Sequence, residues 1–265
     1  MPAPGQLLVP LKPGEAKRAP LFLIQPAGGT VFTYRALAEG LPRELPIYGI
    51  RASGLGPGEL LLSEIKTIAA CCLAQMRSVQ AHGPYLIGGH SAGGVVAYEV
   101  AQQCLAAGEK VELLVLIDAP APAATSRVQV DGLEDLLRQL ASGPEAAPEQ
   151  QRLLAALQAD PQLRRVVHAM TKAVLDYSPA PTTAPILYVR ATRRDAAITD
   201  GAGFWFGMSN DSFVCRTVPG DHFSMMAQPE VERLIDIMRA QLKEAPTQAG
   251  DGGLRPFNKP LSAHK

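Results

Sequence analysis

The chain has 265 residues, of which 47% are hydrophobic, so it is long enough to bury one large core. Its 25 basic and 25 acidic residues cancel, and no dense run of Lys or Arg breaks that balance. Nucleic acid and anionic membranes are therefore not expected partners.

Short apolar runs alternate with longer segments of helical periodicity along the chain. The predicted strands are residues 21–25, 47–50, 85–89, 113–117, 185–190 and 213–218, and the predicted helices are 31–40, 63–81, 93–107 and 228–243. These runs are too continuously apolar for an antiparallel sheet with one wet face. The pattern predicts an α/β fold, with a mostly parallel sheet covered by helices on both faces.

The stretch over about residues 121–178 departs from this alternation. It carries helical spacing at residues 133–141 and 162–175, separated by a segment rich in Gly and Pro. An insertion at this point lies above the carboxyl ends of the strands, where open α/β sheets bind ligands. We therefore interpret it as a helical lid, and the alternative is that it only thickens the scaffold.

Neither the cysteines nor the N-terminus indicates a specialised class of protein. The four cysteines form no CxxC pair and have no His at metal spacing, so neither metal nor redox chemistry is expected. The first 20 residues lack the long apolar stretch of a signal peptide or membrane span, which favours a cytoplasmic location.

A serine lies between small residues where a predicted strand meets a predicted helix. The residues from Gly89 to Gly93 read GHSAG, which fits the pattern G-x-S-x-G. The serine of such a turn has a strained backbone, and Gly89 and Gly93 supply the clearance that strand and helix require. The pattern predicts the nucleophile elbow of an α/β-hydrolase, with Ser91 as the nucleophile.

A serine hydroxyl needs a base to take its proton, and His222 is the best candidate among the five histidines. His222 lies in a loop just past the last predicted strand, which matches the nucleophile, acid, histidine order of α/β-hydrolases. His90 adjoins the serine and is expected to point away from it.

Two aspartates compete to orient the histidine. Asp118 ends the apolar strand that follows the nucleophile, where its carboxylate requires a partner such as an imidazole N–H. Asp195 follows the strand after the insertion, next to two arginines that make it resemble an ordinary surface charge. Asp221 is a third possibility, although its adjacency to His222 makes a side-chain bond awkward. We favour Asp118.

The loop after the first predicted strand reads QPAGGT and offers a second donor for an oxyanion. Pro26 has no N–H, so the Ala27 amide is the nearest candidate, opposite the amide of Ala92. The alternative is an ordinary tight turn with no role in catalysis, which would also use Gly28 and Gly29.

The chain resembles a known family in several motifs. In order, it contains the segments PLFLIQPAGGTVFTYRALAEGL, IYGIRASGL, GPYLIGGHSAGGVVAYEVAQQCLAAGEKVELLVLIDAPAP and VPGDHFSMM. Their order across about residues 19–226 is similar to that of the type I thioesterase domains that terminate polyketide synthases and nonribosomal peptide synthetases.

This resemblance implies a function and a domain organisation. Ser91 would accept an acyl chain from the phosphopantetheine arm of a carrier protein, with His222 as base and Asp118 as its partner, and no bound cofactor would be needed. Water or an internal nucleophile of the chain would then release the product. Residues 1–18 would be a linker from an upstream carrier domain and residues 19–244 the hydrolase domain. Residues 245–265 have little apolar content and are expected to be disordered.

Three alternatives remain at this point. A stand-alone type II editing thioesterase is similar but usually carries its acid where Asp195 stands. A carboxylesterase would share the triad without a carrier protein. A non-catalytic binder with the same fold would be expected to lack a triad residue.

Overall fold

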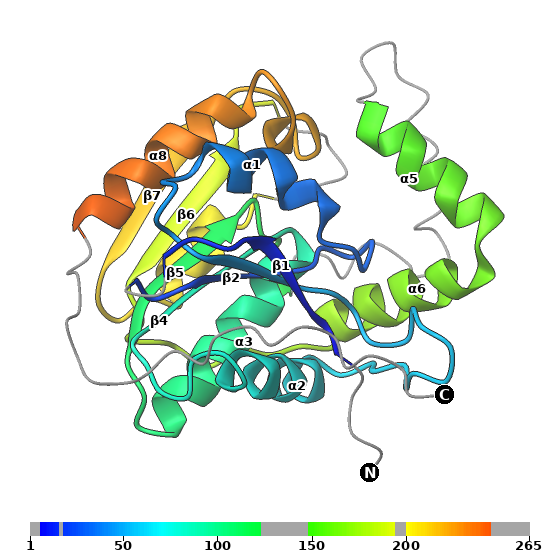
Figure 1. Cartoon of the computed structure of the whole chain (residues 1–265), viewed down its shortest axis with the longest axis horizontal. Helices are drawn as coiled ribbons and strands as arrows, with labels where there is room; N and C mark the ends of the chain where they lie inside the picture. Colours follow the sequence, from blue (N-terminus) through cyan, green and yellow to red (C-terminus); the bar gives the residue numbers. More distant parts are fainter. Residues whose placement is uncertain (1–5, 16–17, 123–147, 194–199, 245–265) are drawn as a thin grey trace.

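A seven-stranded sheet in the order β1-β3-β2-β4-β5-β6-β7 forms the centre of the structure (Figure 1). The computed structural model describes residues 6–15, 18–122, 148–193 and 200–244. β1 is antiparallel to β3, whereas every other pairing in the sheet is parallel. The strands are β1 (Leu8–Lys12), β2 (Leu21–Ile24), β3 (Ile47–Ile50), β4 (Tyr85–His90), β5 (Val111–Ile117), β6 (Ile186–Ala191) and β7 (Phe213–Val218).

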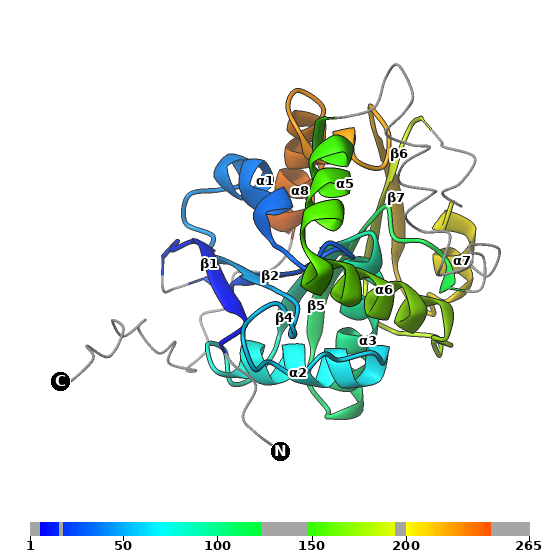
Figure 2. The same ribbon diagram turned by 90° about the vertical axis from the view of Figure 1, so that its right-hand side faces the viewer.

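Helices cover both faces of this sheet. α1 (Arg35–Gly40) and α8 (Val231–Glu244) lie on one face, and α2 (Ile65–Arg77) and α3 (Ala92–Ala106) lie on the other (Figures 1 and 2). Because side chains alternate along a strand, Leu21 and Leu23 join the core under α1 and α8, while Phe22 and Ile24 join the core under α2 and α3. Every residue of β2 is therefore buried, as in a sheet covered on both faces.

Two helices of the predicted insertion are described, α5 (Pro148–Ala159) and α6 (Pro161–Leu175). Asp160 caps α6 by accepting hydrogen bonds from the amides of Gln162 and Leu163. Met170 and Val174 of α6 belong to the core under α3, whereas Leu157 of α5 packs with α6 in a smaller cluster. The two helices lie next to each other, beside the sheet in Figure 1 and in front of it in Figure 2.

The six predicted strands are confirmed to within two residues at each end. The structure contradicts part of the predicted linker, because β1 lies within residues 1–18 and pairs with β3 at the edge of the sheet. Neither α5 nor α7 (Ala202–Gly207) was predicted from the sequence. The helix predicted over residues 133–141 and the tail over residues 245–265 lie outside the described residues.

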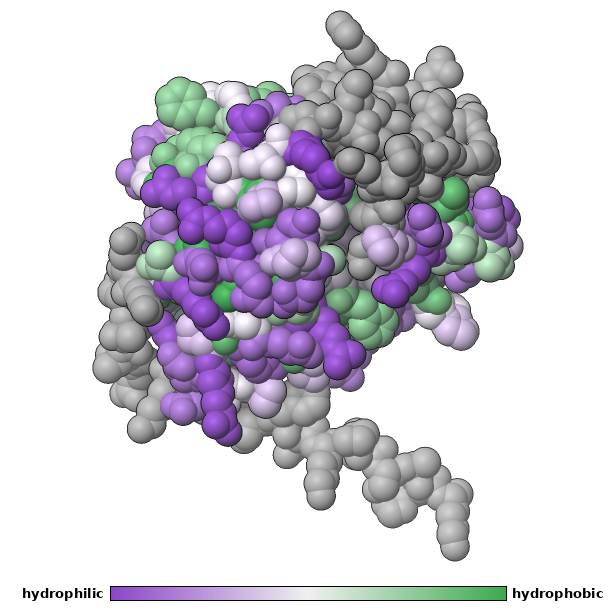
Figure 3. Space-filling view, turned by 90° about the horizontal axis from the view of Figure 1, so that it is seen from above, coloured by the Kyte–Doolittle hydropathy of each residue, from purple (hydrophilic) through white to green (hydrophobic). Residues whose placement is uncertain are grey.

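None of the helices that the structure describes is long and apolar enough to cross a bilayer. The face seen from above is mostly hydrophilic, with apolar side chains interspersed among polar ones (Figure 3).

Candidate active site

Ser91 occupies the sharp turn between β4 and α3. Its backbone has φ 57° and ψ −130°, a region that a residue with a side chain adopts only under strain. The amide of Ser91 donates to the carbonyl of Ile117 at 2.9 Å, and its carbonyl accepts from the amide of Gly94 at 2.9 Å. The strand and the helix therefore both hold the turn in place, as in a nucleophile elbow.

The two glycines of the turn are required by the closeness of the backbone on either side. A Cβ atom on Gly89 would lie 2.3 Å from the carbonyl carbon of Gly93, and one on Gly93 would lie 2.3 Å from the carbonyl oxygen of Ile24. Both distances are far shorter than van der Waals contact, and the opposing atoms belong to the backbone. The same closeness brings the end of β2 against the beginning of α3.

His222 and Asp118 form a buried pair at the carboxyl edge of the sheet. Asp118 Oδ2 lies 2.8 Å from His222 Nδ1, and the two residues are 2% and 8% exposed. Asp118 Oδ1 accepts from the Ala191 amide at 3.1 Å, so both carboxylate oxygens are used. Because a carboxylate only accepts, His222 Nδ1 carries the proton and Nε2 is left with a lone pair in the neutral ring.

The register of the sheet places Ser91 beside this pair. His90 of β4 pairs with Ile117 of β5, so the next residues, Ser91 and Asp118, leave adjacent parallel strands at the same edge. Within the described part of the chain, no hydrogen bond joins the Ser91 hydroxyl to the His222 ring. The hydrogen bond between a catalytic hydroxyl and its base is often long in an enzyme without substrate and shortens when substrate binds.

Asp221 and Asp195 are the other two aspartates that were considered as partners of the histidine. Asp221 Oδ1 accepts from the amides of Phe223 and Ser224, and its Oδ2 pairs with Arg193 at 3.0 Å. Its carboxylate thus shapes the loop that carries His222. Asp195 lies outside the described residues.

The two predicted oxyanion donors lie in neighbouring segments. Ala92 is the first residue of α3, where an amide has no acceptor within its own helix. Ala27 lies in a turn closed by the Gly29 amide, which donates to the Pro26 carbonyl at 2.9 Å. The contact between Gly93 and the end of β2 holds these segments together.

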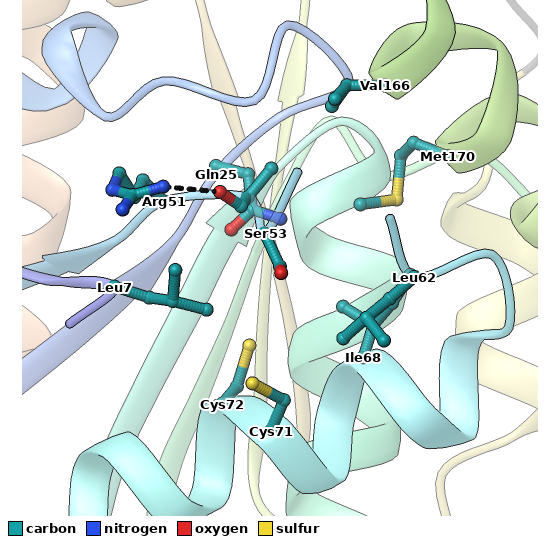
Figure 4. Close-up of a pocket in the computed structure, with 11 residues that line it drawn as sticks. Leu7, Gln25, Arg51, Ser53, Leu62, Ile68, Cys71, Cys72, Val166 and Met170 are labelled. Atoms are coloured by element: carbon teal, nitrogen blue, oxygen red, sulfur yellow. Dashed lines mark hydrogen bonds between the residues drawn. The ribbon is translucent and has the colours of Figure 1, made fainter. Parts of the chain in front are cut away.

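The insertion helices cover the loop that carries Ala27. A Cβ atom on Gly28 would lie 3.4 Å from a methyl of Leu153 on α5, and one on Gly29 would lie 3.2 Å from a methyl of Val166 on α6. A cavity of about 20 Å³, close to the size of one water molecule, opens beside this loop (Figure 4). Gln25, Cys72 and Met170 are among its lining residues.

Sequence reasoning did not predict the contact that His90, the residue before the nucleophile, makes with His222. His90 was expected to point away from Ser91, and the structure places its ring against that of His222, with 4.6 Å between the ring centroids. The two residues are 132 positions apart, so only the fold brings them together.

The described residues contain no group of three or more His, Cys, Asp or Glu side chains placed to hold a metal ion. The site holds a strained serine next to a buried pair of histidine and aspartate, the arrangement found in serine hydrolases. A profile of the thioesterase domain family matches residues 19–242. The chain belongs to this family. This match confirms the predicted resemblance to thioesterase domains and the predicted class of enzyme, a serine hydrolase.

Curated proteins similar to this thioesterase domain are much longer. The non-reducing polyketide synthase atnG of Arthrinium sp is 33% identical over 260 residues, which are 86% of this chain and 13% of the synthase. The inactive atromentin synthetase invA3 of Paxillus involutus is 28% identical over 267 residues, which are 89% of this chain and 28% of that protein. The thioesterase domain thus spans between 12% and 28% of the curated relatives it matches.

Solved structures confirm the α/β-hydrolase fold of the thioesterase domain. The four-domain nonribosomal peptide synthetase AB3403 gives a TM-score of 0.75 at 26% identity, over 91% of this chain and 20% of its own. RedJ, a thioesterase from the prodiginine pathway of Streptomyces coelicolor, gives a TM-score of 0.70 at 25% identity, over 88% of this chain and 90% of its own.

Proposed function

We propose that this thioesterase domain releases an acyl or peptidyl chain from the phosphopantetheine arm of a carrier protein, through an ester on Ser91. The observation that carries the proposal is the 2.8 Å bond between His222 and Asp118, at the sheet edge beside the Ser91 turn. This bond fixes the tautomer in which Nε2 of His222 can accept a proton.

In the acylation step, His222 Nε2 takes the proton of the Ser91 hydroxyl while Oγ attacks the thioester carbonyl carbon. The negative charge that develops on the carbonyl oxygen is stabilised by the amides of Ala27 and Ala92. The carbon–sulfur bond then breaks, and the leaving thiolate takes the proton from His222. The products of this step are the acyl-Ser91 ester and the free thiol of the arm.

In the release step, a second nucleophile attacks the ester while His222 takes its proton. Water gives a free acid, and a hydroxyl or amine within the chain gives a ring. The bond between the acyl carbon and Ser91 Oγ breaks, and His222 returns the proton to the serine. The balance between the two products depends on how well α5 and α6 exclude water from the ester.

A carrier protein is the proposed partner, and its arm is part of the substrate rather than a bound cofactor. Support comes from the curated relatives, whose additional length leaves room for other domains. The α5 and α6 helices lie over the Ala27 loop, so the chain would reach Ser91 beneath them.

The test is release from a purified carrier protein loaded with an acyl chain, with the products identified by mass spectrometry. We expect wild type to release the chain and Ser91→Ala to do so at least about 10⁴-fold more slowly. A fluorophosphonate should add its mass at Ser91 in wild type and at no site in the variant.

A matched soluble ester of the same acyl group distinguishes a carboxylesterase from a thioesterase that serves a carrier. Faster turnover of the soluble ester than of the carrier-bound thioester would contradict the proposal, as would full activity of Ser91→Ala.

A further inference from the structure

His90 is a buried histidine that the mechanism does not use. It ends β4, is 4% exposed, and packs its ring on that of His222 with an angle of 34° between the ring planes. Its Nε2 lies 2.8 Å from the backbone carbonyl oxygen of His222. The residue before the nucleophile thus contacts the base through both its ring and its polar edge.

The chemistry of this contact fixes the state of His90. A carbonyl oxygen can only accept, so Nε2 carries the proton and donates it. Nδ1 is buried and has no hydrogen-bond partner among the described residues. Burial, followed by the nearby His222, lowers the pKa of His90 to about 3, so the ring is neutral at physiological pH.

The backbone of His90 is held from a third direction. Its amide donates to the hydroxyl of Tyr34 at 2.8 Å, and that hydroxyl donates to the Ile24 carbonyl at 2.5 Å. Tyr34 is fully buried, and Ile24 ends the strand that leads into the Ala27 loop. His90 therefore connects three segments, which are the Ala27 loop, the turn at Ser91 and the loop that carries His222.

We propose that His90 is a positioning residue for His222. By donating to the His222 carbonyl and packing against its ring, it holds Nδ1 on Asp118 and keeps Nε2 directed to the serine side of the pair. The proposal rests on the proposed role of His222 as the base. A buried Nδ1 without a partner costs stability that a phenylalanine would not cost, so an imidazole here needs a reason beyond packing.

Two amide side chains of different length separate positioning from packing. His90→Gln can place an N–H near the position of Nε2, whereas His90→Asn carries the same group on a side chain one methylene shorter. We expect His90→Gln to keep kcat within about threefold of wild type and His90→Asn to lower kcat about tenfold, the value of one hydrogen bond. KM should stay within about twofold in both because substrate contacts are unchanged.

His90→Phe keeps a ring of similar size and removes the donor, so we expect the same loss of about tenfold in kcat. The downfield proton resonance of the His222–Asp118 bond, measured without substrate, should persist in His90→Gln and broaden in His90→Phe and His90→Asn. The surface variant His82→Gln is the matched control and should leave both measurements unchanged, since the His82 side chain is 83% exposed.

Wild-type kcat and an unchanged resonance in His90→Phe and His90→Asn would overturn the proposal. So would equal losses in His90→Gln and His90→Asn, because these would indicate packing alone. His222→Ala tests the role of His222 separately from that of His90. An active His222→Ala protein would refute His222 as the base. If the variant is inactive, the comparison of the His90 variants decides whether His90 positions His222.

Discussion

The sheet edge and the insertion helices are built in different ways. At the sheet edge, Ser91 and Asp118 are tied to neighbouring strands by backbone hydrogen bonds, and both have positive φ angles of 57° and 45°. In the insertion, α5 packs on α6 through a small apolar cluster that includes Leu157 and Val167. The groups proposed for the chemistry are therefore fixed by directional bonds, whereas α5 is held by apolar contacts to α6, which itself joins the core under α3.

The largest expected effect concerns the carboxylate at the sheet edge. Asp118→Asn should lower kcat by about 10³-fold to 10⁴-fold, because an amide can present an N–H to His222 and favour the wrong tautomer. Asp195→Asn should change kcat less than about twofold. Single-turnover release from a loaded carrier measures both, and equal losses in the two variants would remove the basis for choosing Asp118.

A second variant tests how tightly the edge is packed. Gly93→Ala should lower the free energy of unfolding by about 3 kcal/mol, because its Cβ would meet backbone at 2.3 Å. Gly203→Ala is the matched control: a Cβ there meets nothing within 4 Å, and alanine should stabilise α7 by up to about 1 kcal/mol. Urea unfolding measures both, and a Gly93→Ala protein as stable as wild type would contradict the packing argument.

The packing of α5 on α6 should respond to substitution differently from the core of the sheet. Leu157→Ala removes a buried side chain from the α5–α6 cluster and should weaken that packing by roughly 2 kcal/mol. We expect faster proteolysis within α5, with little change in the main urea midpoint or in labelling of Ser91 by a small fluorophosphonate. Leu114→Ala, in the core under α3, should instead lower the main midpoint. Equal midpoint losses in the two variants would show that the α5–α6 packing and the sheet unfold as one unit.

The effect that is smallest near neutral pH is a dependence of stability on pH. The pKa of His90 is 6.5 when unperturbed and about 3 in the folded chain, so between these values only the unfolded chain binds its proton. Stability therefore falls as pH is lowered through this window, by up to about 1.4 kcal/mol per pH unit. Since His90→Gln lacks this group, wild type should lose stability relative to the variant between pH 7 and pH 5. Parallel urea midpoints for the two proteins would contradict the burial of His90.

The sequence predicted the sheet well because its signals are local. Runs such as residues 85–89 and 113–117 are continuously apolar, and the glycines at 89 and 93 mark a turn with too little room for a side chain. The pairing of β1 with β3 was missed because it joins distant segments, and β1 contains Pro10, which edge strands tolerate. α5 was missed because Pro148 was interpreted as a break, whereas proline is favoured at the first position of a helix.

The contact between His90 and the loop of His222 could not be predicted for a related reason. Adjacency to Ser91 is visible in the sequence, but the carbonyl that His90 meets arrives only after the last strand has joined the sheet. The two consecutive residues therefore differ, since His90 is buried against the loop of His222 and Ser91 is only half-buried.

The position of α5 and α6 between β5 and β6 has a consequence for how such domains diversify. The ends of these strands are joined directly, since the Asp118 amide donates to Val189 and the Asp118 carboxylate accepts from Ala191. The segment between them can thus differ in length or shape without breaking these two bonds, provided that α6 keeps its packing in the core under α3. Under the proposed function, selectivity for the acyl chain and the ability to break the acyl bond could then evolve separately, and we expect a chimaera with a foreign α5–α6 segment to take the donor's substrate preference.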